Sequence, residues 1–128
     1  MAAIDIPDSV AVIEEAAFGC CMNLKEVKLP KDITYIERSL FADCVSLTDI
    51  TIPDKVYIIE EHAFDWCDNL KNVTLPGGII RIGNNAFDRC SRLENIYYDG
   101  TKAEWDRIKI GTGNDALLKA EKHWREQD

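Results

Sequence analysis

The residues of this chain that could do chemistry are its histidines, its cysteines and its paired carboxylates. His62 and His123 lie far apart in the sequence, and neither has an evident carboxylate or nucleophile partner. The sequence contains no G-x-S-x-G, no glycine-rich phosphate loop and no H-E-x-x-H. The pairs Glu14–Glu15 and Glu60–Glu61 belong to an expected solvent-exposed rim. We therefore predict that the chain is not an enzyme and uses no cofactor.

The five cysteines show the first regularity of the sequence. Cys21, Cys44, Cys67 and Cys90 recur every 23 residues, whereas Cys20 has no equivalent. None of them has the close spacing of a zinc knuckle, and Cys20 and Cys21 lack the Cys-x-x-Cys spacing of a redox pair. We interpret the four regular cysteines as small buried hydrophobes that stack in a ladder, with disulfides between neighbouring repeats as the alternative.

The 23-residue step extends over residues 4–98 and predicts the architecture. A fixed period of this length is typical of a solenoid, in which each unit buries its apolar edge only against its neighbours. We assign four repeats to residues 1–98, with units that begin at Ile4, Val27, Ile50 and Val73. Other positions recur with the same period: Pro7, Pro30, Pro53 and Pro76; Phe18, Phe41, Phe64 and Phe87; Leu24, Leu47, Leu70 and Leu93.

The pattern within one repeat predicts its local structure. Alternating apolar residues at the start, such as Val27 and Leu29, predict a short strand with one buried face. The proline that follows ends the strand, because it has no N–H to donate to a neighbouring strand. A second apolar pair, such as Ile33 and Ile36, predicts another short extended segment on a different wall. The stretch that ends at Cys44 has helical spacing but is short, so we expect one α or 3₁₀ turn there.

Residues 99–128 are expected to close the last repeat with helices. Thr101 and Glu104 have the spacing of a capping box, which predicts a helix over about 102–108. Asn114 is expected to cap a second helix over residues 115–127. The residues expected to pack over the final repeat are Trp105 and Ile108 from the first helix, and Leu117, Ala120 and Trp124 from the second.

Charge and the chain ends limit the possible partners. The formal net charge is −8 at pH 7 and no basic cluster is visible, so we expect no binding to nucleic acid or to an anionic membrane surface. No apolar run approaches the ~20 residues of a membrane helix, and no signal peptide is visible. Only Met1 to Ala3 precede the first strand. We therefore expect either further repeats before it or a homodimer through the uncapped first repeat.

The repeat pattern I-x-I-P-x-x-V-x-x-I-x-x-x-A-F-x-x-C-x-x-L resembles that of the BspA-like class of bacterial leucine-rich repeats. The segment YYDGTKAEWDRIKIGTGNDALL resembles the closing motif of such proteins. The resemblance implies an α/β leucine-rich-repeat solenoid, with a short strand and a short helical turn in each repeat and a C-terminal helical cap. It also implies a secreted or cell-surface binding protein. A cytoplasmic location is the alternative, which reduced cysteines would fit.

One column departs from this family pattern. The family favours glycine where this chain has Gly83, but the equivalent residues of the other repeats are Glu14, Glu37 and Glu60. We expect Arg38, in the adjacent column, to sit diagonally among these glutamates and to offset part of their charge. A divalent-cation site is the alternative interpretation of the column.

Function is expected at the positions that the repeat leaves variable. Side chains that flank the buried strand residues point outward and line up across repeats. We predict a non-catalytic protein-interaction module, within a surface adhesin-like protein, that presents this face to a protein partner. The alternatives are a structural spacer in a longer chain and an intracellular scaffold. The candidate partner-binding residues are two columns and one exposed tryptophan: Glu26, Asp49, Asn72 and Asn95; Lys28, Thr51, Thr74 and Tyr97; and Trp66.

Overall fold

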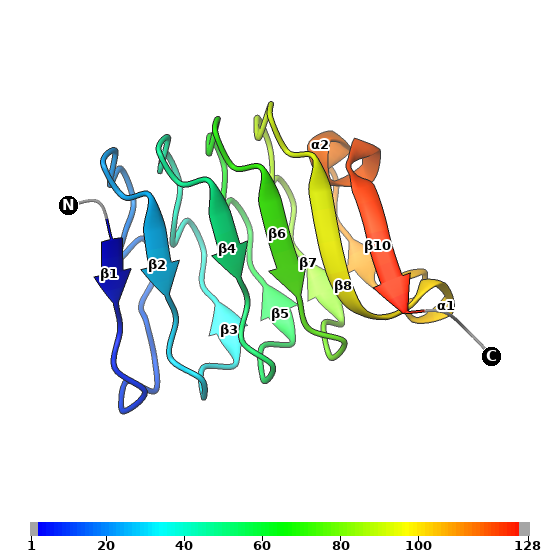
Figure 1. The fold of residues 1–128 in the computed structure, drawn as a ribbon, viewed down its shortest axis with the longest axis horizontal. Coiled ribbons are helices and arrows are strands. Elements are labelled where there is room, and N and C mark those ends of the chain that lie inside the picture. The colour runs from blue at the N-terminus through cyan, green and yellow to red at the C-terminus, as the bar shows by residue number, and fades with distance from the viewer. Residues whose placement is uncertain (1–2, 126–128) are drawn as a thin grey trace.

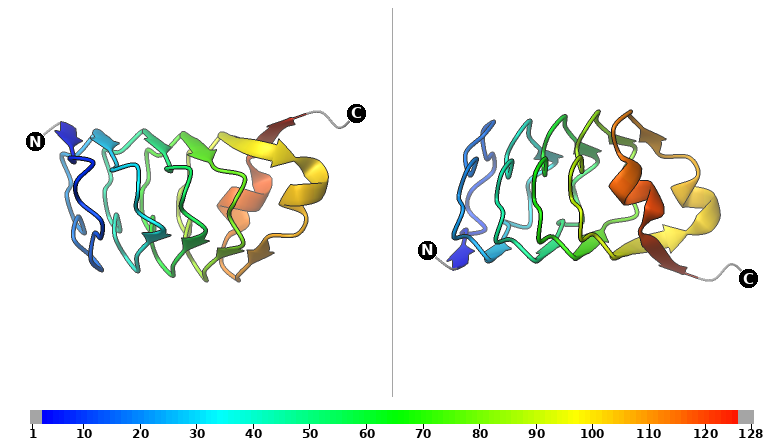
Figure 2. Two further views of the ribbon diagram at one scale, coloured as in Figure 1. Left: turned by 90° about the horizontal axis from the view of Figure 1, so that it is seen from below. Right: turned by 90° about the horizontal axis from the view of Figure 1, so that it is seen from above.

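A computed structural model describes residues 3–125 as a β-solenoid of stacked turns (Figure 1). Two sets of parallel strands lie on opposite sides of the solenoid (Figure 2). We call them the strand face and the second wall. The strand face contains β1 (Ala3–Asp5), β2 (Glu26–Lys28), β4 (Asp49–Thr51), β6 (Asn72–Leu75), β8 (Asn95–Thr101) and β10 (Glu121–Arg125). The second wall contains β3 (Tyr35–Ile36), β5 (Ile58–Ile59), β7 (Arg81–Ile82) and β9 (Lys109–Ile110).

The strands pair in the register that the sequence period dictates. Ile50 pairs with Val73, and Val73 pairs with Ile96, so each residue lies beside its own equivalent in the next repeat. The predicted strand at the start of every repeat is confirmed. The predicted second extended segment is confirmed in the second, third and fourth repeats, where it forms β3, β5 and β7.

Stacked phenylalanine rings fill the space between the two walls. Consecutive rings of the repeat are nearly parallel, with centroids 5.6, 5.4 and 5.1 Å apart from the N-terminal to the C-terminal pair. Phe41, Phe64 and Phe87 are fully buried, whereas Phe18 in the first repeat is half-buried. The core is therefore one continuous stack along the solenoid axis.

The regular cysteines form the expected ladder beside these rings. Cys44, Cys67 and Cys90 are buried, and each thiol donates to a phenylalanine C=O of the preceding repeat at 3.1 Å. All five cysteines are free thiols. Burial raises the pKa of Cys44 to about 11 and that of Cys90 to about 12. The interpretation as buried small side chains is confirmed for these three, while Cys21 is half-buried and Cys20 is exposed.

The segments that return from the second wall to the strand face are runs of turns, so the expected helical turn is wrong. Within a run, Cys44 N–H donates to Phe41 C=O, while Phe41 N–H donates to Ala63 in the next repeat. Two residues in each run have a left-handed backbone, with φ between 57° and 64°. These residues prevent helical hydrogen bonding and turn alternate N–H groups toward the next repeat. The left-handed positions are Ala16 and Cys20, Ser39 and Asp43, His62 and Trp66, and Asn85 and Arg89.

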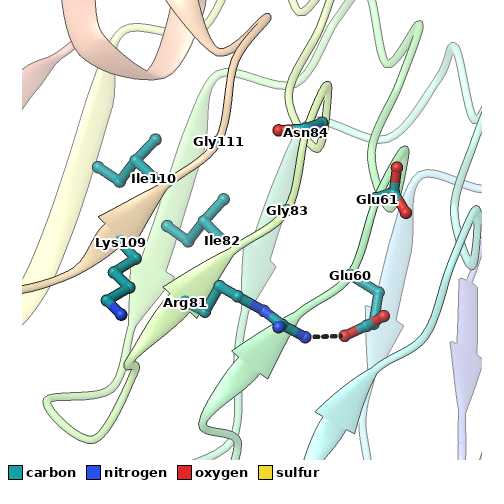
Figure 3. Close-up of a pocket in the computed structure, with 9 residues that line it drawn as sticks. All are labelled: Glu60, Glu61, Arg81, Ile82, Gly83, Asn84, Lys109, Ile110 and Gly111. Atoms are coloured by element: carbon teal, nitrogen blue, oxygen red, sulfur yellow. Dashed lines mark hydrogen bonds and ion pairs between the residues drawn. The ribbon is translucent and has the colours of Figure 1, made fainter.

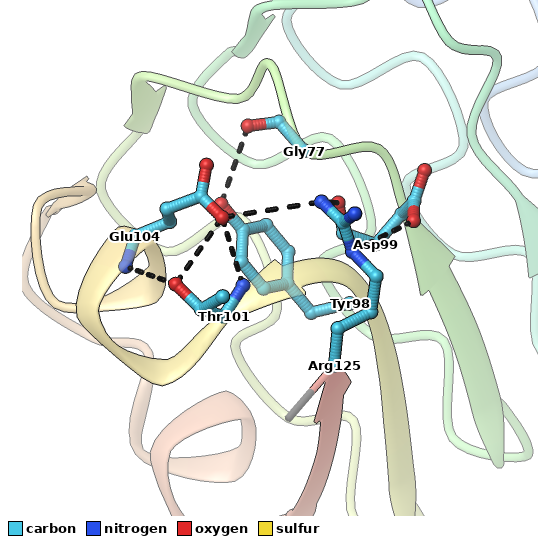
Figure 4. Close-up of polar contacts among 6 residues, drawn as sticks. All are labelled: Gly77, Tyr98, Asp99, Thr101, Glu104 and Arg125. Carbon is cyan, nitrogen blue, oxygen red and sulfur yellow. Dashed lines mark hydrogen bonds and ion pairs between the residues drawn. The ribbon is translucent and has the colours of Figure 1, made fainter. Parts of the chain in front are cut away.

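Residues 95–125 add another turn to the solenoid instead of a purely helical cap. The first helix is confirmed but short: α1 spans Lys102–Trp105 and has a complete capping box. Thr101 accepts the N–H of Glu104, whose carboxylate accepts the N–H of Thr101 at 2.9 Å (Figure 4). The hydrogen bonds that the Glu104 carboxylate accepts from the N–H and the hydroxyl of Thr101 lower its pKa. Trp105 and Ile108 are both buried in the core, as the predicted packing requires.

The second predicted helix is wrong in its C-terminal half. α2 spans Asp115–Lys119, the backbone becomes extended at Ala120, and Glu121–Arg125 pairs with β8 as β10. Residues 126 and 127 of the predicted helix lie outside the described residues. The edge of β8 offers backbone partners that no helix could use, and tertiary pairing overrides local helical pattern. Leu117 and Ala120 are buried as expected, and Trp124 is half-buried against the core.

Asn114 joins this last turn to the fourth repeat. Its Oδ1 accepts the N–H of Phe87 at 3.0 Å, and its Nδ2 donates to the C=O groups of Gly83 and Gly111 at 3.1 and 3.0 Å. In the preceding repeat, the N–H of Phe64 donates instead to a backbone C=O, that of Ala86. The side-chain amide of Asn114 thus takes the place of the backbone C=O that a further repeat would offer to the Phe87 N–H. Asn114 occupies the N-cap position of α2, but its side chain makes no capping hydrogen bond, so the predicted capping role is wrong.

Candidate functional site

The strand face brings the two predicted columns together as adjacent rows of side chains. The first row, which we call the acid–amide row, contains Glu26, Asp49, Asn72 and Asn95 and is extended by Glu121. The second row contains Lys28, Thr51, Thr74 and Tyr97 and is extended by His123. The sequence prediction included neither Glu121 nor His123, because it placed both in a helix.

A chain of hydrogen bonds links part of the acid–amide row. Asn72 Nδ2 donates to Asp49 Oδ1 at 2.7 Å, and Asn95 Nδ2 donates to Asn72 Oδ1 at 2.9 Å. His123 Nε2 lies 3.0 Å from Asn95 Oδ1. Since each amide uses both its oxygen and its nitrogen in contacts with neighbouring side chains of the strand face, these residues hold a fixed polar surface. Their exposed edges can still contact a partner, but their orientation is set before binding.

Tyr97 and His123 form an aromatic platform at the C-terminal end of the second row. Their rings stack with centroids 4.7 Å apart and planes inclined by 17°. Tyr97 is 43% exposed although it is the largest side chain of its row. Exposed tyrosine is a frequent anchor in protein interfaces, because it contributes a large contact area and loses little conformational freedom on binding.

The strand face is interrupted between β2 and β4. β1 pairs with β2, and β4, β6, β8 and β10 pair in order, but β2 and β4 form no ladder. One long backbone hydrogen bond, from Thr48 N–H to Lys25 C=O at 3.5 Å, crosses this step within the described chain. A groove of about 510 Å³ opens here. We call it the strand-face groove; its polar side chains are Glu26, Lys28 and Lys31 on one side, and Asp49, Thr51 and Asp54 on the other.

Trp66 does not join this surface. It lies in a run of turns, with a left-handed backbone at φ 64°, and not on a strand. Its side chain is 42% exposed, as expected, and the Arg89 guanidinium covers the ring at 4.3 Å from the centroid. This cation–π contact explains the exposure of Trp66, so that no partner protein is needed to explain it.

The glutamate column forms a partly compensated charged wall. Arg38 binds Glu61, its own equivalent in the next repeat, at 2.8 Å and does not reach diagonally across the column as expected. Burial and the neighbouring Glu60, Glu15 and Glu14 raise the pKa of Glu37. Among residues 3–125, no group of three or more histidine, cysteine, aspartate or glutamate side chains is placed to hold a metal ion.

Both histidines have carboxylate neighbours that the sequence analysis did not find. His62 Nδ1 lies 3.1 Å from Asp65 Oδ2 in the same turn, and His123 Nε2 lies 3.6 Å from Glu121 Oε2. The i,i+3 spacing of His62 and Asp65 was the available signal. Neither histidine lines the strand-face groove, and each has neighbours within its own repeat or strand that fix its position.

The first repeat exposes part of its apolar edge. A hollow of about 430 Å³ lies beside Ile4, Phe18 and Leu24. Phe18 is the first ring of the phenylalanine stack, and one side of this ring stacks on Phe41. The homodimer through this repeat stays a prediction, and sedimentation over a range of concentrations would test it: a single monomeric species at every concentration contradicts it.

Parallel strands in 23-residue register, stacked phenylalanines and a polar strand face define a leucine-rich-repeat solenoid. The chain belongs to the BspA type leucine rich repeat family, of which six copies match residues 1–107. The match extends beyond the four repeats assigned from the sequence and includes α1. No curated protein matches the chain at a significant level. No helix in the described part of the chain is long and apolar enough to cross a membrane.

Solved bacterial structures share the fold. A leucine rich cell surface protein from Faecalibacterium prausnitzii A2-165 is 35% identical, with a TM-score of 0.83 over 85% of this chain and 29% of its own. A T. pallidum leucine rich repeat protein is 26% identical, with a TM-score of 0.77 over 88% of this chain and 53% of its own. A Bacteroides ovatus leucine-rich repeat protein is also 26% identical, with a TM-score of 0.71 over 86% of this chain and 33% of its own. The chain thus spans about half or less of each of these proteins.

Proposed function

We propose that the chain is a non-catalytic protein-interaction module that binds a protein partner across its strand face. The observation that carries this proposal is the strand-face groove, because it opens the otherwise paired sheet among the predicted partner-binding residues. Its first side has Lys28 and Lys31 with Glu26, and its second side has Asp49 and Asp54 with Thr51. A partner with both signs of charge in matching order would be complementary to it, and such complementarity contributes specificity and association rate.

The rest of the strand face supports the same role. The acid–amide row is ordered by its own hydrogen bonds, so a partner would not need to immobilise these side chains. The Tyr97–His123 platform supplies an aromatic anchor next to that row. The strand-face groove, the acid–amide row and the Tyr97–His123 platform thus belong to one surface.

Blocking the groove tests the proposal. Thr51→Arg places a long charged side chain in the groove at an exposed position, whereas Ser91→Arg makes the same addition in an exposed turn. Partners would be captured with the wild-type chain and both variants, and the bound surface would be mapped by hydrogen exchange. We expect Thr51→Arg to lose a partner that Ser91→Arg retains, with protection over β2, β4 and β8. Equal retention by both variants, or protection away from the strand face, contradicts the proposal.

We also propose a cell-surface location. The support is the likeness to the Faecalibacterium prausnitzii protein, which is described as a cell surface protein. Treatment of intact cells of the source organism with a protease tests this location. The expected result is loss of the chain together with a known surface marker. Its survival until the cells are lysed would place it inside the cell instead.

A further inference from the structure

We propose that the second wall carries another docking site, distinct from the strand face, for a partner protein segment that presents a carboxylate beside an aliphatic side chain. The site consists of a groove over β7 and β9 and an exposed apolar shoulder next to it. None of the partner-binding residues predicted from the sequence lies on this wall. Exposed tyrosine, isoleucine, arginine and lysine side chains lie together on this wall.

The groove has a volume of about 530 Å³ and lies where the glutamate column ends. Gly83 and the following Gly111 occupy the floor at the positions that succeed Glu60 (Figure 3). The two carboxylates that line the groove are already paired: Glu60 binds Arg81 at 2.9 Å, and Glu61 binds Arg38 at 2.8 Å. The two acidic side chains that line the groove are therefore compensated before any ligand binds.

Lys109 supplies a positive charge that the wall does not neutralise. It pairs in register with Arg81, so the two cationic side chains lie on adjacent strands, and both are exposed. Within residues 3–125, no carboxylate lies at ion-pair distance from the Lys109 ammonium group. A carboxylate from a partner is the complementary charge, in a chain whose overall net charge of −8 would otherwise repel it.

The floor of the groove is closely packed backbone. A Cβ atom at Gly83 would lie 2.7 Å from the nitrogen of Glu61, and one at Gly111 would lie 2.7 Å from the nitrogen of Asn84. Glycine is required at such a close approach to the backbone of the preceding repeat, so neither position adds a side chain to the groove. The positive charge available to a partner carboxylate therefore comes from Lys109, and a hydrogen bond between an ammonium group and a carboxylate is charge-assisted.

The apolar shoulder consists of Tyr35, Tyr57 and Ile80. Ile80 is 57% exposed, and its backbone bonds to Tyr57 on one side and to Lys109 on the other, so the shoulder borders the groove. Tyr57 and Tyr35 make an edge-to-face contact at 5.1 Å, and their hydroxyl groups lie 3.1 Å apart. Tyrosine beside arginine and aliphatic side chains is the composition of interface centres. An aliphatic partner residue next to the carboxylate would cover Ile80.

A pair of matched peptides tests the proposal. The probe is Ac-Glu-Leu-Glu-Leu-Glu-NH2, the control peptide has glutamine in place of each glutamate, and binding is followed by amide chemical shifts at low salt. We expect shifts concentrated at residues 57–61, 80–84 and 109–111. Lys109→Gln should weaken binding roughly two- to fivefold, as for one exposed ion pair. Lys25→Gln removes the same charge beside the strand face and should change nothing.

Four results would overturn the proposal: equal binding of the glutamine peptide, equal effects of Lys109→Gln and Lys25→Gln, shifts spread over both walls, or shifts confined to the strand face. Shifts confined to the strand face would reject the second-wall site and leave the strand-face proposal standing. Ile80→Ser tests the shoulder separately. It should weaken the acidic peptide while the chemical shifts of the unbound chain stay unchanged outside the second wall.

Discussion

Replacing Asn114 by alanine should destabilise the chain strongly, because this side chain stands in for the backbone of another repeat. Asn114 is 1% exposed and makes hydrogen bonds to Phe87, Gly83 and Gly111 at 3.0–3.1 Å. Alanine would remove all three and leave the buried Phe87 N–H without an acceptor. A net loss of about 0.5–1.5 kcal/mol for each of the two hydrogen bonds that Nδ2 donates, and about 1–3 kcal/mol for the unpaired Phe87 N–H, gives an expected cost of about 2–6 kcal/mol.

Equilibrium urea unfolding measures this cost. Asn114→Ala should lower the midpoint at an unchanged m-value, since the folded structure still exposes the same surface on unfolding. Asn23→Ala at an exposed position is the control and should stay within about 0.5 kcal/mol of the wild type. A value for Asn114→Ala within that same range would refute the reasoning that the amide replaces a repeat.

Asn114→Asp separates the acceptor from the donors. Aspartate retains an oxygen for the Phe87 N–H, but its ionised form faces the C=O groups of Gly83 and Gly111 without a proton to donate. Burial and these carbonyls would raise the pKa of the carboxyl group in the folded chain. Stability of this variant should therefore fall as the pH rises through that pKa. A pH-independent difference from the wild type would contradict this account of the site.

Three further predictions concern the turns, the glutamate column and the thiols. Ala16→Gly should stabilise the chain by about 1 kcal/mol, because Ala16 has a left-handed backbone with φ 60°. Ala17→Gly, at the neighbouring position, should destabilise the chain instead. Urea unfolding measures both effects, and a change of the same sign for both variants would contradict the left-handed assignment of Ala16. The raised pKa of Glu37 means that its ionised form opposes folding, so stability is lost as the pH rises through that pKa. Glu37→Gln should therefore stabilise the chain at neutral pH and have no such effect at about pH 3, and a stabilisation of equal size at both would be inconsistent with this origin. A thiol reagent should label Cys20 in the folded chain and Cys67 only after unfolding, and equal labelling rates would argue against the buried ladder.

The sequence predicted the parts of this fold that depend on neighbouring repeats. Phe41 and Cys44 recur with their equivalents because each contacts the same residues one repeat away. Such positions appear in the sequence as residues that recur every 23 positions. The first strand of each repeat, the second extended segment and the buried thiols were therefore predictable from spacing alone.

Local pattern failed where tertiary hydrogen bonds decide the conformation. The stretch ending at Cys44 has helical spacing, but its left-handed residues Ser39 and Asp43 direct N–H groups to the next repeat. The segment Glu121–Arg125 continues a helical pattern, yet it pairs with β8. The same error hid His123 from the candidate site. The strand-face groove could not be predicted, because β2 and β4 contain the same repeat pattern as the strands that do pair.

The end formed by Asn114 and α2 also determines how such a chain can change its length. Every contact in the phenylalanine stack and the thiol ladder involves only adjacent repeats, so the end of the solenoid does not depend on how many units precede it. Insertion of a 23-residue unit between the third and fourth repeats would preserve the terminal closure and move the strand-face groove, which lies between the second and third repeats, further from it. Gene duplication could thus vary the distance between the strand-face groove and the Tyr97–His123 platform while the contacts between adjacent repeats stay the same.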